Sequence, residues 1–134
     1  MRHTNETWTK EYDFKSNFKY CLDKGKEGEE YTRKILNGDF KIETKVDFLC
    51  KDTGNVFIEY KSRGKDSGIK VTTADFWNFV LPESNDTYPL IIFIHINKLK
   101  KLVEDKKYKT VVGGDNKTSV GYLIPKEDII KLNK

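Results

Sequence analysis

Residues 46–61 have the sequence VDFLCKDTGNVFIEYK, and this stretch decides how the chain is interpreted. Apolar and polar residues alternate on both sides of Asp52-Thr53-Gly54, which predicts two strands joined by a tight turn. A three-residue loop with Gly54 in the left-handed region pairs Asp47 with Glu59. One face of this hairpin is then apolar and consists of Val46, Phe48, Cys50, Val56, Ile58 and Tyr60. A four-residue loop would place Asp47 opposite Tyr60 and mix the two faces, so the first register is favoured.

The other face of the predicted hairpin carries Asp47, Glu59 and Lys61. Two carboxylates that face each other on neighbouring strands repel, which is unfavourable unless a cation lies between them. Mg²⁺ prefers oxygen ligands, keeps several waters and needs only one or two protein carboxylates. A Glu-x-Lys pair on a strand also occurs on ordinary solvated faces, and only the Asp in register favours a metal site over that reading.

Elsewhere the hydrophobic pattern predicts alternating helices and strands. Up to residue 20 there is no clear periodicity, and Trp8, Tyr12, Phe14 and Phe18 suggest an arm or short helix. A helix is expected over 23–36, with Gly28, Tyr31, Thr32 and Ile35 on one face and a stop at Asn37-Gly38. The expected elements after the hairpin are a polar loop over 62–70, a helix from Thr72 or Thr73 to Leu81, a strand over 89–96 buried on both faces, a helix capped by Asn97, a hairpin over 109–112 and 119–124, and a helix over 125–132.

Composition limits the class of protein. The chain has 134 residues, enough for a single domain, and its net charge of +4 permits a polyanionic partner without requiring one. Its two cysteines do not form a disulfide framework or a four-ligand zinc site. We find no apolar signal region at the N-terminus, no stretch long enough to span a bilayer and no nucleotide-binding Walker motif. We therefore expect a cytoplasmic protein with free thiols, no membrane association and no nucleotide cofactor.

Asp47 followed by Glu59-Tyr60-Lys61 resembles the signature of the PD-(D/E)xK nucleases. The resemblance covers about residues 24–96, and it is similar in look to small phage and Holliday-junction-resolvase-like endonucleases, so a phage-encoded protein acting in a bacterial host fits. Gly28-Glu29 resembles the motif on the first helix of the family, although Glu27 and Glu30 are alternatives to Glu29. The chain departs from the family in having Val46 where proline often precedes the aspartate.

The resemblance implies an α/β fold with a restriction-endonuclease-like αβββαβ core, a central mixed sheet flanked by helices and a C-terminal α-β-β-α extension. All 134 residues would form one nuclease-like domain, with an N-terminal arm or helix over 1–22, the catalytic core over 23–96 and a peripheral extension over 97–134.

The resemblance also implies the roles of the site residues. Asp47, Glu59 and the backbone carbonyl of Tyr60 would bind Mg²⁺, or Mn²⁺ as a substitute, and Glu29 would complete the shell through a water or a second metal. Lys61 would orient the attacking water and stabilise charge on the phosphate. The reaction would be hydrolysis of a DNA phosphodiester that leaves a 5′-phosphate and a 3′-hydroxyl.

Further residues are candidates for contacts with DNA. Arg63, Lys65 and Lys70 would contact phosphates unless they merely decorate a solvated loop. Thr72 and Thr73 would place a helix N-terminus near the same phosphates, with simple helix capping as the alternative. Trp77 would stack on a base, whereas a helical aromatic more often packs in the core.

Three functions follow from these expectations. The first is a metal-dependent endonuclease that acts on branched or structured DNA as a homodimer, because cutting two strands needs two active sites. The second is a nuclease-like fold kept as a DNA-binding or inhibitory module without catalysis. The third is a repair or restriction-type nuclease that acts on linear duplex.

Overall fold

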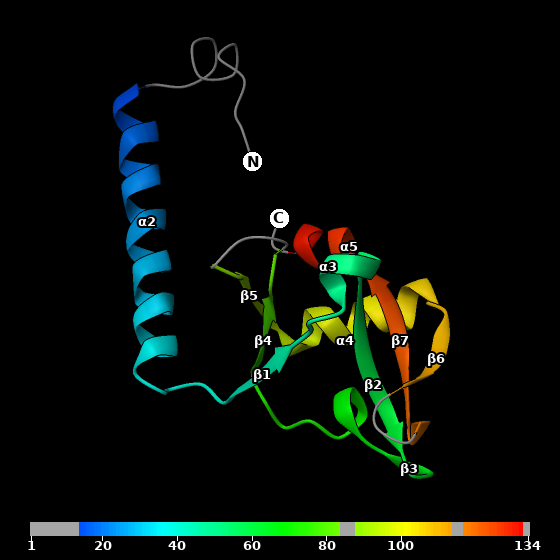
Figure 1. The fold of residues 1–134 in the computed structure, drawn as a ribbon. Helices are drawn as coiled ribbons and strands as arrows, with labels where there is room; N and C mark the ends of the chain where they lie inside the picture. The colour runs from blue at the N-terminus through cyan, green and yellow to red at the C-terminus, as the bar shows by residue number, and fades with distance from the viewer. Residues whose placement is uncertain (1–13, 84–87, 114–116, 133–134) are drawn as a thin grey trace. The chain divides into compact units, whose positions relative to one another are not determined.

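The computed structural model describes residues 14–83, 88–113 and 117–132, and the chain divides into two compact units, Met1–Phe40 and Lys41–Lys134. The first unit contains helix α2 (Phe14–Leu36; Figure 1). Its end at Asn37-Gly38 is confirmed, because Gly38 adopts φ 80° and the Asn37 N–H donates to the Arg33 carbonyl at 2.8 Å. The helix begins well before the predicted start, and Trp8 and Tyr12 lie outside the described residues.

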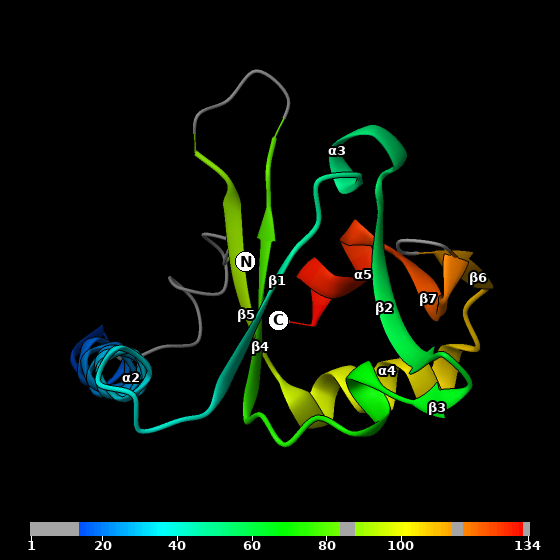
Figure 2. The same ribbon diagram turned by 60° about the horizontal axis from the view of Figure 1, so that its bottom comes forward.

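The second unit contains two sheets, which lie beside each other in Figure 2. The first sheet is mixed and has the order β1-β4-β5, with β1 (Ile42–Val46) parallel to β4 (Phe76–Leu81) and β4 antiparallel to β5 (Leu90–His95). The second sheet is antiparallel and has the order β3-β2-β7-β6. Its strands are β3 (Lys65–Asp66), β2 (Asn55–Ser62), β7 (Ser119–Pro125) and β6 (Thr110–Gly113).

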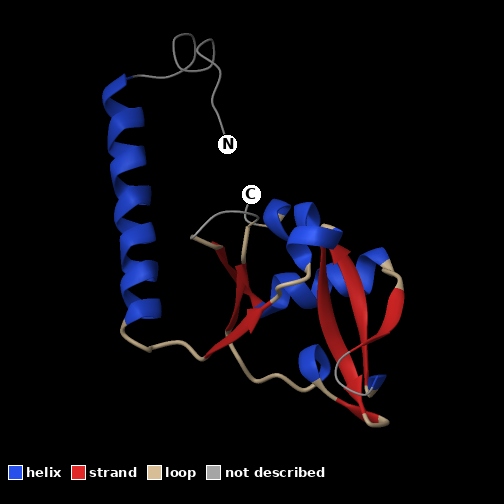
Figure 3. Ribbon diagram, viewed as in Figure 1, coloured by secondary structure: helices blue, strands red, loops and turns tan. Residues whose placement is uncertain are grey.

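Short helices accompany both sheets (Figure 3). They are α3 (Cys50–Thr53), the 3₁₀ turn η1 (Gly68–Lys70), α4 (Ile96–Lys106) and α5 (Lys126–Lys131). The core combines residues of both sheets with the inner sides of α4 and α5, among them Ile58, Trp77, Phe79, Ile94, Leu99, Ile124 and Ile129. The general α/β class, with a mixed and an antiparallel sheet and flanking helices, is therefore confirmed. No helix in the described parts of the chain has the length and apolar character needed to cross a bilayer.

The predicted hairpin between residues 46 and 61 is wrong. The chain leaves β1 at Asp47 and makes the helical turn α3, and β2 then pairs with β7 in the other sheet. Gly54 is left-handed as expected, at φ 76°, but it ends α3 by donating its N–H to the Cys50 carbonyl at 2.7 Å. An alternating pattern identifies a strand but not its partner, because the pattern contains no information about which backbone supplies the hydrogen bonds.

The predicted helix over residues 72–81 is also wrong, because Phe76–Leu81 is the central strand of the first sheet. Its FWNFVL sequence is rich in aromatic and β-branched residues, and tertiary pairing on both edges outweighs a weak local signal. The αβββαβ order expected from the sequence therefore fails at this point.

Most predictions for the later part of the chain are confirmed. β5, α4, the β6–β7 hairpin and α5 occur close to the predicted ranges. Two details differ: β5 is an edge strand whose Ile91 is 53% exposed, and His95 rather than Asn97 caps α4, its Nδ1 accepting from the Asn97 N–H at 3.2 Å. The segment after residue 97 is not peripheral, because β7 pairs with β2 along its length.

Candidate functional site

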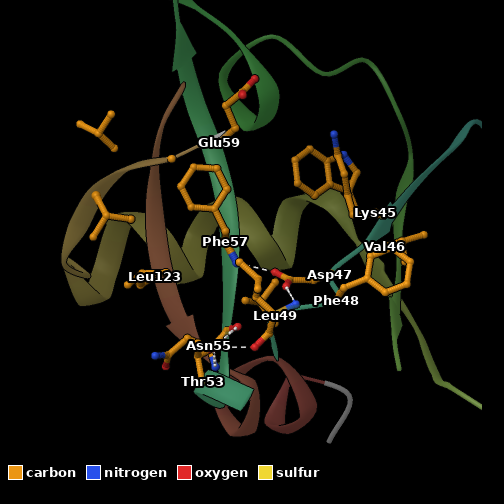
Figure 4. Close-up of a pocket in the computed structure, with 15 residues that line it drawn as sticks. Lys45, Val46, Asp47, Phe48, Leu49, Thr53, Asn55, Phe57, Glu59 and Leu123 are labelled. Atoms are coloured by element: carbon orange, nitrogen blue, oxygen red, sulfur yellow. Dashed lines mark hydrogen bonds between the residues drawn. The ribbon is translucent and has the colours of Figure 1, made fainter. Parts of the chain in front are cut away.

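A cavity of about 630 Å³ lies where the end of β1 approaches β2 (Figure 4). Its charged or polar lining residues are Lys45, Asp47, Thr53, Asn55 and Glu59, and its apolar ones are Val46, Phe48, Leu49, Val56, Phe57, Trp77, Val111, Val112, Gly113 and Leu123. Asp47 and Glu59, which the sequence paired as metal ligands, thus line one cavity although their predicted hairpin does not form. In Figure 4 Asp47 lies beside the backbone of Phe57, and Glu59 lies further along β2.

Backbone N–H groups surround the Asp47 carboxylate. Its Oδ1 accepts from Leu49 and Cys50, both at 3.1 Å, and its Oδ2 accepts from Phe57 at 2.9 Å. Its own N–H donates to the Val80 carbonyl at 3.1 Å, which extends the β1–β4 pairing by one residue. A carboxylate has about four lone-pair positions, so Asp47 organises the start of α3 and keeps one position for a further ligand.

Glu59 is in a different situation. Its side chain is half-buried at the cavity wall and has no hydrogen-bond or ion-pair partner among the described residues. Its backbone is held closely, because Gly68 passes so near that a Cβ there would lie 2.0 Å from the Glu59 carbonyl oxygen. The Glu59 backbone is therefore closely packed, and its carboxylate has no counter-charge in the described structure.

Lys61 and Tyr60 follow Glu59 across an irregularity in β2. The register with β7 shifts between Glu59 and Lys61, so counting in steps of two no longer places those two side chains on one face. Lys61 is half-buried and is not among the cavity-lining residues. The Tyr60 carbonyl, expected as a metal ligand, accepts the Ser67 N–H at 3.0 Å, and the Tyr60 ring packs on Tyr122.

A polar network beside the cavity was missed by the sequence analysis. Lys45 forms an ion pair with Glu43 at 2.6 Å and lies over the Trp77 ring at 5.0 Å. Thr72 donates to Glu43 at 3.1 Å and accepts from the Trp77 Nε1–H at 3.1 Å. The signal that could have found this network is the spacing of Glu43, Lys45 and Asp47 at steps of two along β1 and the residue that follows it.

Thr72, Thr73 and Asp75 do not begin a helix. The Thr72 hydroxyl accepts the Ala74 N–H at 3.2 Å, and Thr73 accepts from the Lys41 ammonium at 2.8 Å. Asp75 accepts the Lys41 N–H at 2.8 Å, so it too is bound to the segment that leads into β1. The phosphate site that was predicted at a helix N-terminus is therefore absent from this segment.

Trp77 is only 1% exposed and packs against Phe79 in the core. A ring that is covered to this degree offers no free face to a base, so we remove Trp77 from the residues expected to contact DNA. The alternative interpretation, an aromatic residue of the core, is the correct one.

The remaining predicted residues lie in two places. Arg63, Lys65 and Lys70 follow the end of β2 and are exposed, and Lys70 lies 3.9 Å from Asp66 and 4.9 Å from the centre of the Tyr60 ring. Glu29 is exposed on α2, which belongs to the first unit.

Both cysteines are free, as expected. Cys21 is exposed on α2, whereas Cys50 is buried in α3. Burial raises the pKa of the Cys50 thiol, and the negative charge of Asp47 raises it further. A raised pKa keeps this thiol protonated at neutral pH, which argues against a nucleophilic role.

The acidic residues of the cavity can be compared with the ligands that a divalent cation needs. Within the described residues no three His, Cys, Asp or Glu side chains gather as a metal-binding group, so a metal held here would rely on two protein carboxylates and water. That is the ligand set Mg²⁺ accepts. Asp47 keeps one lone-pair position and Glu59 has an unpaired carboxylate, but in Figure 4 the Glu59 carboxylate points away from Asp47, with Phe57 between them along β2, so a cation at either one would take most of its ligands from water.

Comparison of the chain with protein-family models, with curated proteins and with solved structures found no match.

Proposed function

We propose that this chain is a divalent-metal-dependent endonuclease that hydrolyses phosphodiester bonds in DNA. The observation that carries the proposal is Glu59, a half-buried carboxylate with no partner among the described residues, on the wall of the cavity that Asp47 also lines. A carboxylate on a cavity wall that makes no hydrogen bond or ion pair in the described structure is free to accept a cation as a ligand. Asp47 and Glu59-Tyr60-Lys61, which carry the resemblance to the PD-(D/E)xK nucleases, all belong to this one unit.

Each residue has a role in the proposal. Asp47 and Glu59 would hold Mg²⁺, which when bound lowers the pKa of a water and withdraws charge from a phosphate. Lys61 would orient the attacking water. The water oxygen bonds to phosphorus, the bond between phosphorus and O3′ breaks, and a proton reaches O3′, leaving a 5′-phosphate and a 3′-hydroxyl.

The proposal extends to the substrate and the assembly. The proposed substrate is branched or structured DNA, in the manner of a Holliday-junction resolvase. Cutting two strands needs two active sites, so the active form would be a homodimer. Linear duplex is the competing substrate.

A second candidate function has its own observation. Three backbone N–H groups already occupy the Asp47 carboxylate, which gives Asp47 a structural role that needs no metal. This favours a nuclease-like fold that binds DNA without cutting it.

The test compares wild-type protein with Glu59→Gln on labelled branched and linear DNA, with Mg²⁺, with Mn²⁺ and with EDTA. Glu59→Gln keeps the shape of the side chain and removes its charge, and because the carboxylate has no partner to lose we expect the stability to change by less than about 0.5 kcal/mol. Glu104→Gln is the matched control, since Glu104 is exposed on α4, outside the cavity lining.

We expect metal-dependent cutting by the wild type and by Glu104→Gln, and its loss in Glu59→Gln together with weaker Mn²⁺ binding in calorimetry. Cutting by Glu59→Gln at the wild-type rate would overturn the assignment of Glu59. Tight DNA binding by the wild type without cutting under either metal would establish the non-catalytic module instead.

A further inference from the structure

Two turns that are far apart in sequence meet at one end of the second sheet. Ser62 pairs with Ser119, and the Arg63 N–H donates to the Thr118 carbonyl at 2.9 Å. The segment after β2 therefore lies directly beside the segment that begins at Lys117. Lys117 was not among the residues predicted to contact DNA.

This end of the sheet is strongly basic. The two segments, 61–70 and 117–120, contain five cations, Lys61, Arg63, Lys65, Lys70 and Lys117, and a single carboxylate, Asp66. Asp66 is 3.9 Å from Lys70, so their pairing is weak. The side chains of the other four cations form no hydrogen bond or ion pair with any residue that the structure describes. We call residues 61–70 and 117–120 the basic end.

At each of the two turns a residue with a long side chain has a left-handed backbone conformation. Arg63 has φ 52° and Lys117 has φ 54°, in the left-handed region that glycine or asparagine occupies more easily. Such conformations cost about 1 kcal/mol or more for other residues. Lys107 at the end of α4 is also left-handed, at φ 46°, so the proposal rests on the charge gathered at the two turns and not on their backbone conformation.

The basic end is continuous with the cavity. Glu59 lines the cavity and precedes Lys61 by two residues on β2, and Gly113 lines the cavity and pairs with Ser119 on β7. The basic end and the cavity are therefore neighbours along β2 and along the β6–β7 pair.

We propose that the basic end binds the sugar-phosphate backbone of duplex DNA on one side of the phosphate that is cut, with Arg63, Lys65 and Lys117 as a joint clamp from two turns. The inference rests on the proposed nuclease function and deepens it by naming the surface that holds the substrate. Because the contacts are to phosphates, binding is independent of base sequence and falls with salt concentration.

The test measures binding of fluorescein-labelled duplex DNA by anisotropy in EDTA, where no cutting occurs. The variant Arg63→Ala/Lys65→Ala/Lys117→Ala leaves Lys61 intact, because Lys61 has a role in the proposed chemistry. The control Lys100→Ala/Lys109→Ala/Lys131→Ala removes the same charge from exposed lysines outside the basic end. Thermal unfolding verifies that both variants fold.

We expect the first variant to bind at least about tenfold more weakly and to lose roughly 2–3 from the slope of log K against log salt between about 50 and 200 mM. The control should keep most of its affinity and slope. An equal loss in both variants, no loss in either, no binding by the wild type, or preference for duplex RNA over duplex DNA would each overturn the proposal.

The two proposals fail separately. If the wild type cuts DNA and the first variant binds as tightly as the wild type, the basic end is wrong and the nuclease stands. If the first variant loses binding while no protein cuts under any metal, the basic end stands and the nuclease is wrong.

Discussion

The Asp47 carboxylate accepts a hydrogen bond from the Phe57 backbone N–H at 2.9 Å, and this contact joins the end of β1 in one sheet to β2 in the other. Asp47 was predicted as a metal ligand. In the structure its carboxylate links the two sheets beside the cavity.

This contact predicts that Asp47→Asn is destabilising. An amide keeps one oxygen acceptor but turns an NH₂ donor toward an N–H that needs an acceptor, which costs about 1–3 kcal/mol when the group is partly buried. Urea unfolding measures the loss. Asp52→Asn, at an exposed position of α3, is the control and should change stability by less than about 0.5 kcal/mol. Equal stability of the two variants would show that Asp47 has no structural role.

The network at Thr72 predicts that Thr72→Val is destabilising by about 1–3 kcal/mol, because the buried Trp77 Nε1–H and the Ala74 N–H lose their acceptor. Thr72→Ser keeps the hydroxyl and should restore most of the stability. Chemical denaturation followed by tryptophan fluorescence distinguishes the two variants. If serine is as damaging as valine, the hydroxyl is not the group that matters.

We expect a side chain at position 68 to displace the strand that carries Glu59. An alanine there is strained at φ 53°, and its Cβ would lie 2.0 Å from the Glu59 carbonyl oxygen, so β2 must move. We expect a loss of more than about 2 kcal/mol, against about 1 kcal/mol for Gly64→Ala, which is left-handed but has open space around it. Thermal unfolding of both variants provides the comparison. Similar losses in the two variants would mean that the close approach to Glu59 is easily relieved.

The hydrogen bond between Tyr108 and Asp128 leads us to expect a loss of stability at high pH. The Tyr108 hydroxyl donates to Asp128 at 2.6 Å, and burial together with this negatively charged acceptor raises the pKa of the phenol. Because the folded state favours the neutral phenol, the contribution of Tyr108 is fully present below the unfolded pKa of about 10 and is lost as the pH rises above it.

Tyr108→Phe isolates that contribution. At pH 8 we expect the wild type to be more stable by roughly 1.5–3 kcal/mol, the range for a hydrogen bond to a charged group, and we expect the difference to shrink above about pH 10. Urea unfolding of both proteins from pH 8 to 11 tests this. A difference that stays constant with pH would contradict the expectation.

Short stretches of sequence correctly predicted the helix ends and strands that depend only on neighbouring residues. Gly38 ends α2, and the apolar run at residues 90–95 is a strand. Asp47 and Glu59 were singled out because a hairpin register placed them opposite each other; that hairpin does not form, and both residues line one cavity for a different reason, the approach of β1 to β2. Lys45 and Glu43 were missed because a Glu-x-Lys pair on a strand resembles an ordinary solvated face.

By itself the sequence determined the α/β class, the end of α2, most strand positions in the second unit and the identity of Asp47 and Glu59 as the residues to examine. Only the tertiary structure decided that β1 pairs with β4, that β2 pairs with β7, that residues 76–81 form a strand and that Lys117 joins Arg63. The reason is physical: alternation and capping act between neighbours in the chain, whereas the partner of each backbone N–H is chosen by packing between segments that are distant in sequence.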